Sequence, residues 1–294
     1  MKNKLIAVSV LAVLALAGYF GKDTATAEVA QEQSAALSVA TEEAAPASVA
    51  ASEPAAEKPE QKTGGRKIEQ PGKMKHTPER FVEHVGYMLS FNREHNNPNW
   101  VAWELTAAEA GGTLPRDDNF QPDPLLPKNH QVAHADYTRS GYDRGHMVPA
   151  ADMKWNSRAM AECFYMSNIC PQTHALNAGV WETLESACRR WAKQEGSVYI
   201  VCGPVYKGNK QKHIGKNLSI TVPDGFFKVV LSLRKDHEKA IGFYYANTDA
   251  KQNFAAGATT VDAIEEMTGI DFYVNIDDRL ESRLESAYSL KAWR

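Results

Sequence analysis

The tetrapeptide Asp143-Arg144-Gly145-His146 places an acid, a base, a glycine and a histidine in consecutive positions. Imidazole can accept a proton from water near neutral pH, and a guanidinium group can hold a phosphate oxygen in a fork. Glycine lets the backbone turn or approach closely beside the histidine. These residue types suit hydrolysis of a phosphodiester, although the tetrapeptide alone also fits a surface loop with an ion pair.

A second polar segment runs from Ser167 to Asn177 and leads into a stretch that carries Glu185 and Arg189. The amide oxygen of Asn177 is a hard ligand of the kind that binds Mg²⁺, an ion that usually keeps several waters. Alternatively, Asn177 only caps a helix. It lies about 12 Å along a helix axis from Glu185, so Glu185 should reach the same ion through water. A helix-surface ion pair between Glu185 and Arg189 is the alternative for both residues.

The elements that must position these residues follow from the spacing of apolar side chains. A helix is predicted over Ala178–Lys193, where Trp181, Leu184, Cys188 and Trp191 form an apolar stripe. A second helix is predicted over Thr260–Met267, with Gly269 just past its end. Strands are predicted over Gly86–Phe91, Val101–Leu105, Val198–Cys202, Leu218–Val222, Phe226–Leu233 and Ala240–Tyr245.

The turn Pro223-Asp224-Gly225 is expected to join the strands on either side of it. Strands come in runs and do not alternate strictly with helices. This order favours an α+β fold with a mixed, largely antiparallel sheet.

The N-terminal part of the chain differs in composition from the rest. Lys2 and Lys4 precede an apolar run from Leu5 to Phe20, which is short for a membrane span and typical of a signal peptide. An uncleaved membrane anchor is the alternative. Either way, we expect the rest of the chain outside the cytoplasm, in the periplasm or secreted, with membrane contact only through an anchor.

No aromatic residue occurs between Phe20 and Phe81, and the segment is rich in Ala, Glu, Ser and Pro. Such a composition cannot bury enough apolar surface to offset its ordering entropy. We therefore expect a signal peptide or anchor over 1–27, a disordered low-complexity linker over 28–75 and a folded domain over 76–294.

The formal net charge of −3 excludes a strong basic excess, and residues 76–294 hold 24 basic and 27 acidic side chains. A protein that coats nucleic acid would be strongly basic, whereas a few clustered arginines suffice for a nuclease.

The sequence has four cysteines, at positions 163, 170, 188 and 202. Either disulfides or buried free thiols fit them. Because there is no Cys-x-x-Cys motif, a structural zinc site is not expected.

The motifs together resemble the DNA/RNA non-specific endonucleases of the ββα-metal (His-Me finger) superfamily. The similarity rests on His146, Asn168-x-x-Pro171-Gln172, Leu176-Asn177, Trp181 and Leu184-Glu185, and it extends over roughly residues 80–290. Upstream, Asn99–Leu105 resembles the family's Pro-x-Trp-Val strand, and Arg116 followed by Phe120, Asp123 and Pro124 resembles its arginine-rich loop. Downstream, Val201–Tyr206 resembles its Gly-Pro strand end.

This resemblance implies a ββα-metal catalytic core in which His146 is the general base. Asn177 would be the direct protein ligand of a hydrated Mg²⁺, with Mn²⁺ or another divalent cation as the alternative, and Glu185 would act through water. Asn168 would help to position the metal-water cluster or the histidine loop. The arginines implied to face phosphates are Arg116, Arg144 and Arg189.

Three neighbouring residues are given lesser roles. Asp143 is expected to brace the loop, Gln172 to be structural and His174 to be an exposed loop residue.

Together the motifs favour an endonuclease that cuts DNA and RNA with little sequence preference. A domain retained only for binding nucleic acid or a partner, and a phosphodiesterase for small nucleotides, are the alternatives; formation of a homodimer is left open.

Overall fold

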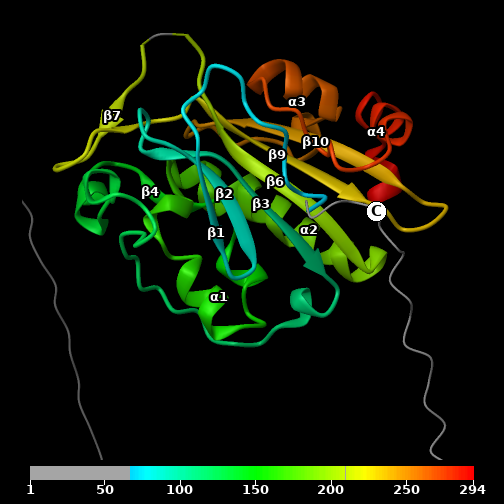
Figure 1. The fold of residues 1–294 in the computed structure, drawn as a ribbon, viewed down its shortest axis with the longest axis horizontal. Coiled ribbons are helices and arrows are strands. Elements are labelled where there is room, and N and C mark those ends of the chain that lie inside the picture. Colours follow the sequence, from blue (N-terminus) through cyan, green and yellow to red (C-terminus); the bar gives the residue numbers. More distant parts are fainter. Residues whose placement is uncertain (1–66, 209) are drawn as a thin grey trace, which may run out of the picture. The chain divides into compact units, whose positions relative to one another are not determined.

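The computed structural model describes residues 67–208 and 210–294, so the expected signal peptide or anchor lies outside the described residues. The central element is a seven-stranded sheet in which every neighbouring pair is antiparallel, in the order β1-β2-β3-β6-β9-β10-β11 (Figure 1). These strands are Arg80–His84, Tyr87–Asn92, Asn97–Thr106, Ser197–Val205, Gly225–Ser232, Lys239–Ala246 and Ala258–Thr259. The predicted α+β class with a largely antiparallel sheet is confirmed.

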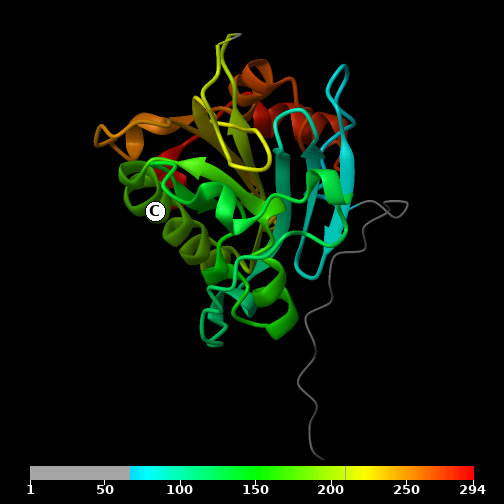
Figure 2. The same ribbon diagram turned by 90° about the vertical axis from the view of Figure 1, so that its left-hand side faces the viewer.

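Helices cover both faces of this sheet. On β9, Phe226 and Val230 belong to one apolar cluster, whereas Phe227 and Val229 belong to a second cluster. Successive side chains of a strand point to opposite faces, so the two clusters lie on opposite sides. Helix α2 (Glu182–Glu195) packs on the first side, and α3 (Val261–Thr268) and α4 (Asp278–Glu285) pack on the second (Figures 1 and 2).

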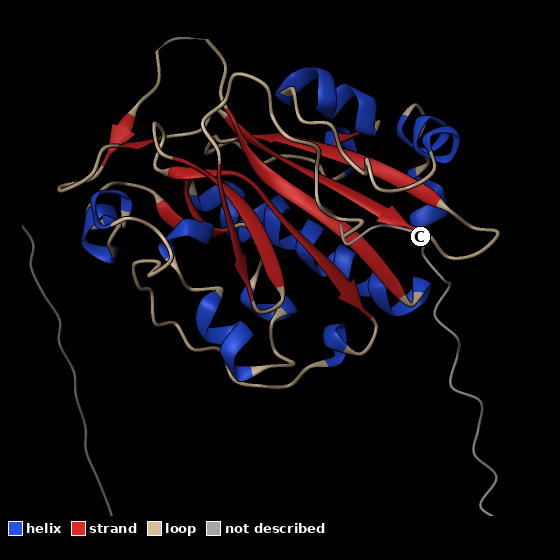
Figure 3. Cartoon of the chain, viewed as in Figure 1, coloured by secondary structure: helices blue, strands red, loops and turns tan. Residues whose placement is uncertain are grey.

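Five of the six predicted strands match strands of the large sheet (Figure 3). The sixth prediction, Leu218–Val222, contains only the short β8 (Ile220–Thr221), which pairs with β7 (His213–Ile214). The expected turn at Pro223-Asp224-Gly225 does connect β8 to β9. The two strands do not pair with each other, because β9 pairs with β6 and β10. The turn residues determine only that the chain changes direction there. Which strands pair with β9 depends on the burial of the apolar side chains on both of its faces.

The predicted helix over Thr260–Met267 is α3. Thr260 is its N-cap and accepts a hydrogen bond from the Ala263 amide at 3.1 Å, and Gly269 follows its end with a φ of 69°. These are the local signals that begin and end a helix. The other predicted helix, Ala178–Lys193, is divided between a π-type turn, η6 (Leu176–Trp181), and α2. The helices α1 (Ser157–Glu162) and α4 were not predicted.

The folded part includes residues on the N-terminal side of His76. Ile68 is buried in the cluster beneath α3 and α4, and the Gly72 amide donates to the carbonyl of Asp271 at 2.8 Å. The side chain of Asn275 also donates to the Lys67 carbonyl at 2.9 Å. The domain therefore takes in residues 67–75, which we expected in the linker, because one isolated apolar residue gives no periodic signal. Within the described residues, no helix is long and apolar enough to cross a membrane.

Candidate active site

The expected Asp143–His146 segment forms strand β4, which pairs antiparallel with β5 (Ile169–Gln172). Asp143 lies opposite Gln172, and His146 lies opposite Ile169. The turn η6 and helix α2 follow β5. The Trp181 indole, at the end of η6, donates to the His146 carbonyl at 3.3 Å and ties the helical segment to β4. Two short strands and a helix thus frame the candidate catalytic residues.

Gly145 allows the backbone of β4 to approach the side chain of Gln172. A Cβ at position 145 would overlap the Gln172 amide, which is fully buried. Glycine is therefore required by a close approach, as the sequence predicted, and Gln172 occupies the structural position expected of it.

His146 is only 8% exposed, and its ring is held by two aromatic side chains. The Phe164 ring meets it edge-on at 4.9 Å between centroids, and the Phe120 ring lies at 5.4 Å. Its Nε2 has no hydrogen-bond partner among the described residues. Burial, reinforced by the charge of Arg116, lowers the pKa of His146 to about 3, so the imidazole is neutral at pH 7.

Two of the three expected arginines flank this aromatic pair. The Arg116 guanidinium carbon lies 4.9 Å from the Phe164 ring centroid, and that of Arg144 lies 4.8 Å from the Phe120 centroid. The positive charges of both arginines contribute to the low pKa of His146. The Arg144 Nε is buried without a partner among the described residues, whereas Arg116 pairs with Asp118. Two cationic groups and one neutral imidazole therefore share this region.

Asn177 lies inside η6 and does not cap a helix. The N-cap position of α2 is Trp181, and no side chain caps it. The Asn177 Nδ2 donates to the Asp143 carboxylate at 3.0 Å, and His174 hydrogen-bonds to the same oxygen at 2.9 Å. The Asn177 Oδ1 takes no part in the hydrogen bonds of the described residues. The capping alternative is wrong, and Asp143 braces the loop as expected.

Asn168 is hydrogen-bonded to the backbone on both sides of its amide group. It is fully buried, and its Oδ1 accepts from the Val148 amide at 2.9 Å. Its Nδ2 donates to the carbonyls of Val148 and Cys163 at 3.0 and 2.8 Å. Of the two expected roles, only support of the histidine loop fits, because these backbone bonds occupy the amide.

The charge of a buried lysine, which carried no signal in the sequence, acts on Glu185. Lys228, on β9, is 0% exposed, and its Nζ lies 4.6 Å from the Trp181 ring centroid and 5.1 Å from that of Trp103. Burial raises the pKa of Glu185 to about 7, and Lys228 is the largest opposing influence. The Glu185 carboxylate has no hydrogen-bond partner and no ion-pair partner among the described residues.

Arg189 pairs with Asp152 and not with Glu185. Its Nη1 lies 3.0 Å from the Asp152 carboxylate, its Nη2 donates to Ser186 at 2.8 Å, and its side chain is 20% exposed. The helix-surface pair considered for Glu185 and Arg189 is therefore wrong. Arg189 neutralises a buried aspartate, whereas Arg116 and Arg144 are the arginines beside His146. Asp152 carried no signal, because its partner lies 37 positions away.

The four cysteines are buried free thiols, which decides between the two alternatives left by the sequence. The Cys163 thiol donates to the Met160 carbonyl and the Cys202 thiol to the Met147 carbonyl. Burial raises the pKa of both thiols to about 12, so they are protonated and unreactive near neutral pH.

The oxygen donors of Asn177 and Glu185 are of the kind that a hard divalent cation prefers. Asn177 offers an unused amide oxygen, and Glu185 offers a carboxylate with no partner among the described residues. Mg²⁺ prefers such oxygen ligands and completes its octahedral shell with water. A hydrated ion held by few protein ligands is thus compatible with this donor set.

Comparison with known proteins places these features in one family. The family described as DNA/RNA non-specific endonuclease matches residues 66–279. A nuclease from Nostoc sp. is 35% identical over 214 residues, which cover 68% of this chain and 75% of the relative. Nuclease C1 from Cunninghamella echinulata is 33% identical over 211 residues, which cover 67% and 84%. The mitochondrial nuclease EXOG of Danio rerio is 37% identical over 168 residues, 54% of this chain and 49% of the relative.

The fold has a matching solved structure. A chain in the crystal structure of the EndoG/EndoGI complex is similar with a TM-score of 0.65 and 28% sequence identity. The similarity covers 69% of this chain and 89% of that one. The chain thus has the ββα-metal nuclease fold that the sequence led us to expect.

Proposed function

Because this chain belongs to the DNA/RNA non-specific endonuclease family, we propose that it is a Mg²⁺-dependent endonuclease that hydrolyses phosphodiester bonds in both DNA and RNA. The observation that carries the proposal is the buried, neutral His146, whose Nε2 has no partner among the described residues and whose neighbours include Arg116 and Arg144.

His146 would act as the general base. A neutral imidazole whose Nε2 has no partner in the described part of the chain can take a proton from the attacking water, and the rings of Phe120 and Phe164 keep it in one orientation. A pKa of about 3 makes a weak base. An anionic phosphate bound beside Arg116 and Arg144 would offset their charge and so raise the basicity of His146 when substrate is present.

Arg116 and Arg144 would hold the phosphate group. Both guanidinium groups lie over aromatic rings next to His146, and the Arg144 Nε is an unused donor among the described residues. Contacts to the backbone of a nucleic acid carry no sequence information, which suits a nuclease with little sequence preference.

A divalent cation, with Mg²⁺ expected first and Mn²⁺ as the alternative, would supply neutralisation of charge on the phosphoryl oxygens and the leaving 3′-oxygen. Asn177 would hold the ion directly through Oδ1, and Glu185 through a water molecule. Asp143 would keep the Asn177 amide in the required orientation through their 3.0 Å hydrogen bond.

The test uses the purified full chain with supercoiled DNA and with RNA, in Mg²⁺ and in chelator. We expect cleavage of both polymers that chelator abolishes and that His146→Ala reduces by roughly 10²–10⁴-fold, the usual range for a general acid-base group. His237→Ala is the matched control, because His237 lies exposed after β9 and away from β4. Full activity in His146→Ala would contradict the role of His146 as the general base.

Export is a further part of the proposal. It rests on Lys2, Lys4 and the apolar run from Leu5 to Phe20. Several relatives are named as mitochondrial, so the destination needs its own measurement: N-terminal sequencing of the protein recovered from periplasm, medium and membranes. Recovery from the cytoplasm with residues 1–27 intact would contradict export. Light scattering of the same preparation tests the homodimer.

A further inference from the structure

Six carboxylates gather around α3 and α4, on the side of the sheet away from α2. Two of them are three positions apart on α3, and three on α4 have spacings of three and four positions. These spacings place each set on one face of its helix. The sixth lies in the loop between the helices. They are Asp262, Glu265, Asp271, Asp278, Glu281 and Glu285.

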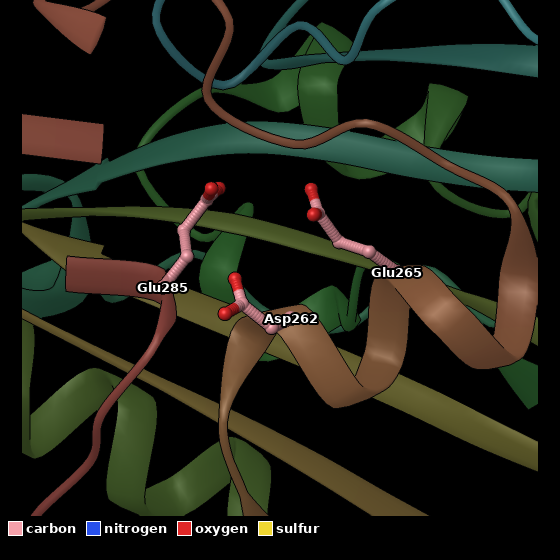
Figure 4. A group of neighbouring side chains, drawn as sticks. All are labelled: Asp262, Glu265 and Glu285. Atoms are coloured by element: carbon pink, nitrogen blue, oxygen red, sulfur yellow. The ribbon is translucent and has the colours of Figure 1, made fainter. Parts of the chain in front are cut away.

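Three of these carboxylates converge on one point. One oxygen each of Asp262, Glu265 and Glu285 lie within 4.8 Å of one another. Figure 4 shows the three side chains directed toward a common space between the first turns of α3 and the end of α4. Ca²⁺ binds oxygen at 2.3–2.6 Å, so two ligands of one ion are at most about 5 Å apart. The three oxygens are close enough to share one ion.

Glu285 adds an independent observation. It is 6% exposed, and its Oε1 has no hydrogen-bond partner among the described residues. It also lines a hollow of about 450 Å³ between the helices. A buried polar atom without a partner is costly, and such atoms in folded proteins are normally bonded. An unpaired carboxylate oxygen that faces a hollow points to a ligand that supplies positive charge.

Basic side chains do not compensate this cluster. Among the described residues that line the hollow, none is Lys, Arg or His. Glu285 is moreover the last residue of α4, where the helix dipole disfavours a negative charge. A cation in the hollow would relieve each of these costs.

One of the three side chains is already positioned for such an ion. The Glu265 Oε1 accepts a hydrogen bond from the Phe272 amide at 2.7 Å, which restrains the carboxylate. Its other oxygen remains available. The backbone after α3 therefore helps to hold a ligand in place.

We propose that Asp262, Glu265 and Glu285 bind one calcium-type divalent cation, with Asp271 and Glu281 available from the wall of the hollow. Several carboxylates around one point suit Ca²⁺, which accepts many oxygen ligands in variable geometry, whereas Mg²⁺ demands strict octahedral geometry and keeps most of its waters. The site joins α3 to α4 on the other side of the sheet from α2, so its effect is on stability and is separate from the proposed catalytic cation.

Thermal unfolding of the full chain in chelator and in Ca²⁺ tests this site. At about a hundredfold excess over Kd, we expect Ca²⁺ to raise Tm by roughly 5–10 °C. Glu285→Gln and Asp262→Asn should lose most of this rise. Asp262 is exposed, so its variant keeps the fold if Glu285→Gln does not. Glu266→Gln is the matched control, because it removes the same charge from an exposed position on α3 outside the cluster.

Each other outcome overturns the proposal. Absence of a Ca²⁺-dependent rise in the unaltered chain, or an equal rise in Glu285→Gln and Asp262→Asn, would exclude binding at this cluster. A rise with Mg²⁺ as large as that with Ca²⁺ would overturn the calcium-type assignment. Asn177→Ala should keep the full rise, which separates this site from the proposed catalytic one; loss of the rise in that variant would place the ion at β4 instead.

Discussion

The carboxylate of Asp143 accepts a hydrogen bond from the side-chain amide of Asn177 at 3.0 Å. The acid of the tetrapeptide thus orients an amide at the start of the helical segment, 34 positions later in the chain. The amide oxygen is the end that points away from this bond and is available to the proposed cation, because Nδ2 is the atom that faces Asp143.

Asp143→Asn should weaken Mg²⁺ binding without removing any direct ligand. An amide at this position can donate or accept, so it no longer dictates which end of Asn177 faces the ion. Loss of such a supporting bond typically costs 10–100-fold in metal affinity. The dependence of DNA cleavage on Mg²⁺ concentration measures it. His174→Ala, which removes only the exposed partner of Asp143, should have a smaller effect, and unchanged Mg²⁺ dependence in Asp143→Asn would contradict the orienting role.

Asn177→Ala should reduce Mg²⁺ affinity more than Asp143→Asn does, because it deletes the proposed ligand itself. Asn177 caps no helix. The free energy of unfolding in chelator should therefore fall by no more than the roughly 0.5–1.5 kcal/mol of one hydrogen bond. Urea unfolding and Mg²⁺ titration of the same preparation measure the two effects. A variant that unfolds readily but keeps its Mg²⁺ dependence would favour a purely structural asparagine.

Gly145→Ala should destabilise the β4–β5 pair, because the added methyl group overlaps the Gln172 side chain. Overpacking of this kind costs about 1–3 kcal/mol. Since the obstacle is a side chain, Gln172→Ala in the same chain should recover part of the loss. A double-mutant cycle by urea unfolding should give a coupling of roughly 0.5–3 kcal/mol. Additive effects would show that the two side chains do not compete for this space.

His146 should make the protein sensitive to acid. Its folded-state pKa of about 3 lies below the ordinary value of 6.5. The unfolded chain therefore binds a proton below pH 6.5 that the folded chain excludes, and stability falls as the pH decreases toward 3. The loss is about 1.4 kcal/mol per pH unit. Urea unfolding at pH 7.5, 5.5 and 4.5 should show a shallower decline in His146→Gln; parallel declines would mean that His146 is readily protonated in the folded state.

Lys228→Met should shift the pH dependence of Mg²⁺ use. The charge of Lys228 opposes the burial that raises the pKa of Glu185 to about 7. Without this charge, Glu185 keeps its proton up to a higher pH. As the pH is lowered, cleavage at limiting Mg²⁺ should therefore begin to decline at a higher pH than in the unaltered chain. Glu185→Gln should remove this step, and adding Lys228→Met to it should cause no further shift.

Stability provides the control for Lys228→Met. The Lys228 ammonium group is buried and has no hydrogen-bond partner among the described residues. Replacement of a buried charge by an apolar side chain of similar length is often neutral or stabilising. The variant should therefore fold. If the variant has native stability and the pH profile of the unaltered chain, then Lys228 does not influence the pKa of Glu185.

Short-range chemistry made part of the molecule predictable from its sequence. The cap at Thr260 and the glycine at 269 mark the ends of α3, and apolar patterns located five strands of the large sheet. The resemblance carried by His146, Asn177 and Glu185 identified the family and the candidate site before any contact was known. These signals are all contained in local runs of residues, so no knowledge of the fold is needed to read them.

Only the tertiary structure decided what surrounds those residues. Phe120 and Phe164 pack against His146, the charge of Lys228 acts on Glu185, and Arg189 pairs with Asp152. None of these relationships has a local sequence signal, because each joins residues from different elements. Burial then determines the charge state of these groups. An imidazole or carboxyl group has its ordinary pKa in water, and its pKa moves away from that value when neighbouring elements exclude the water.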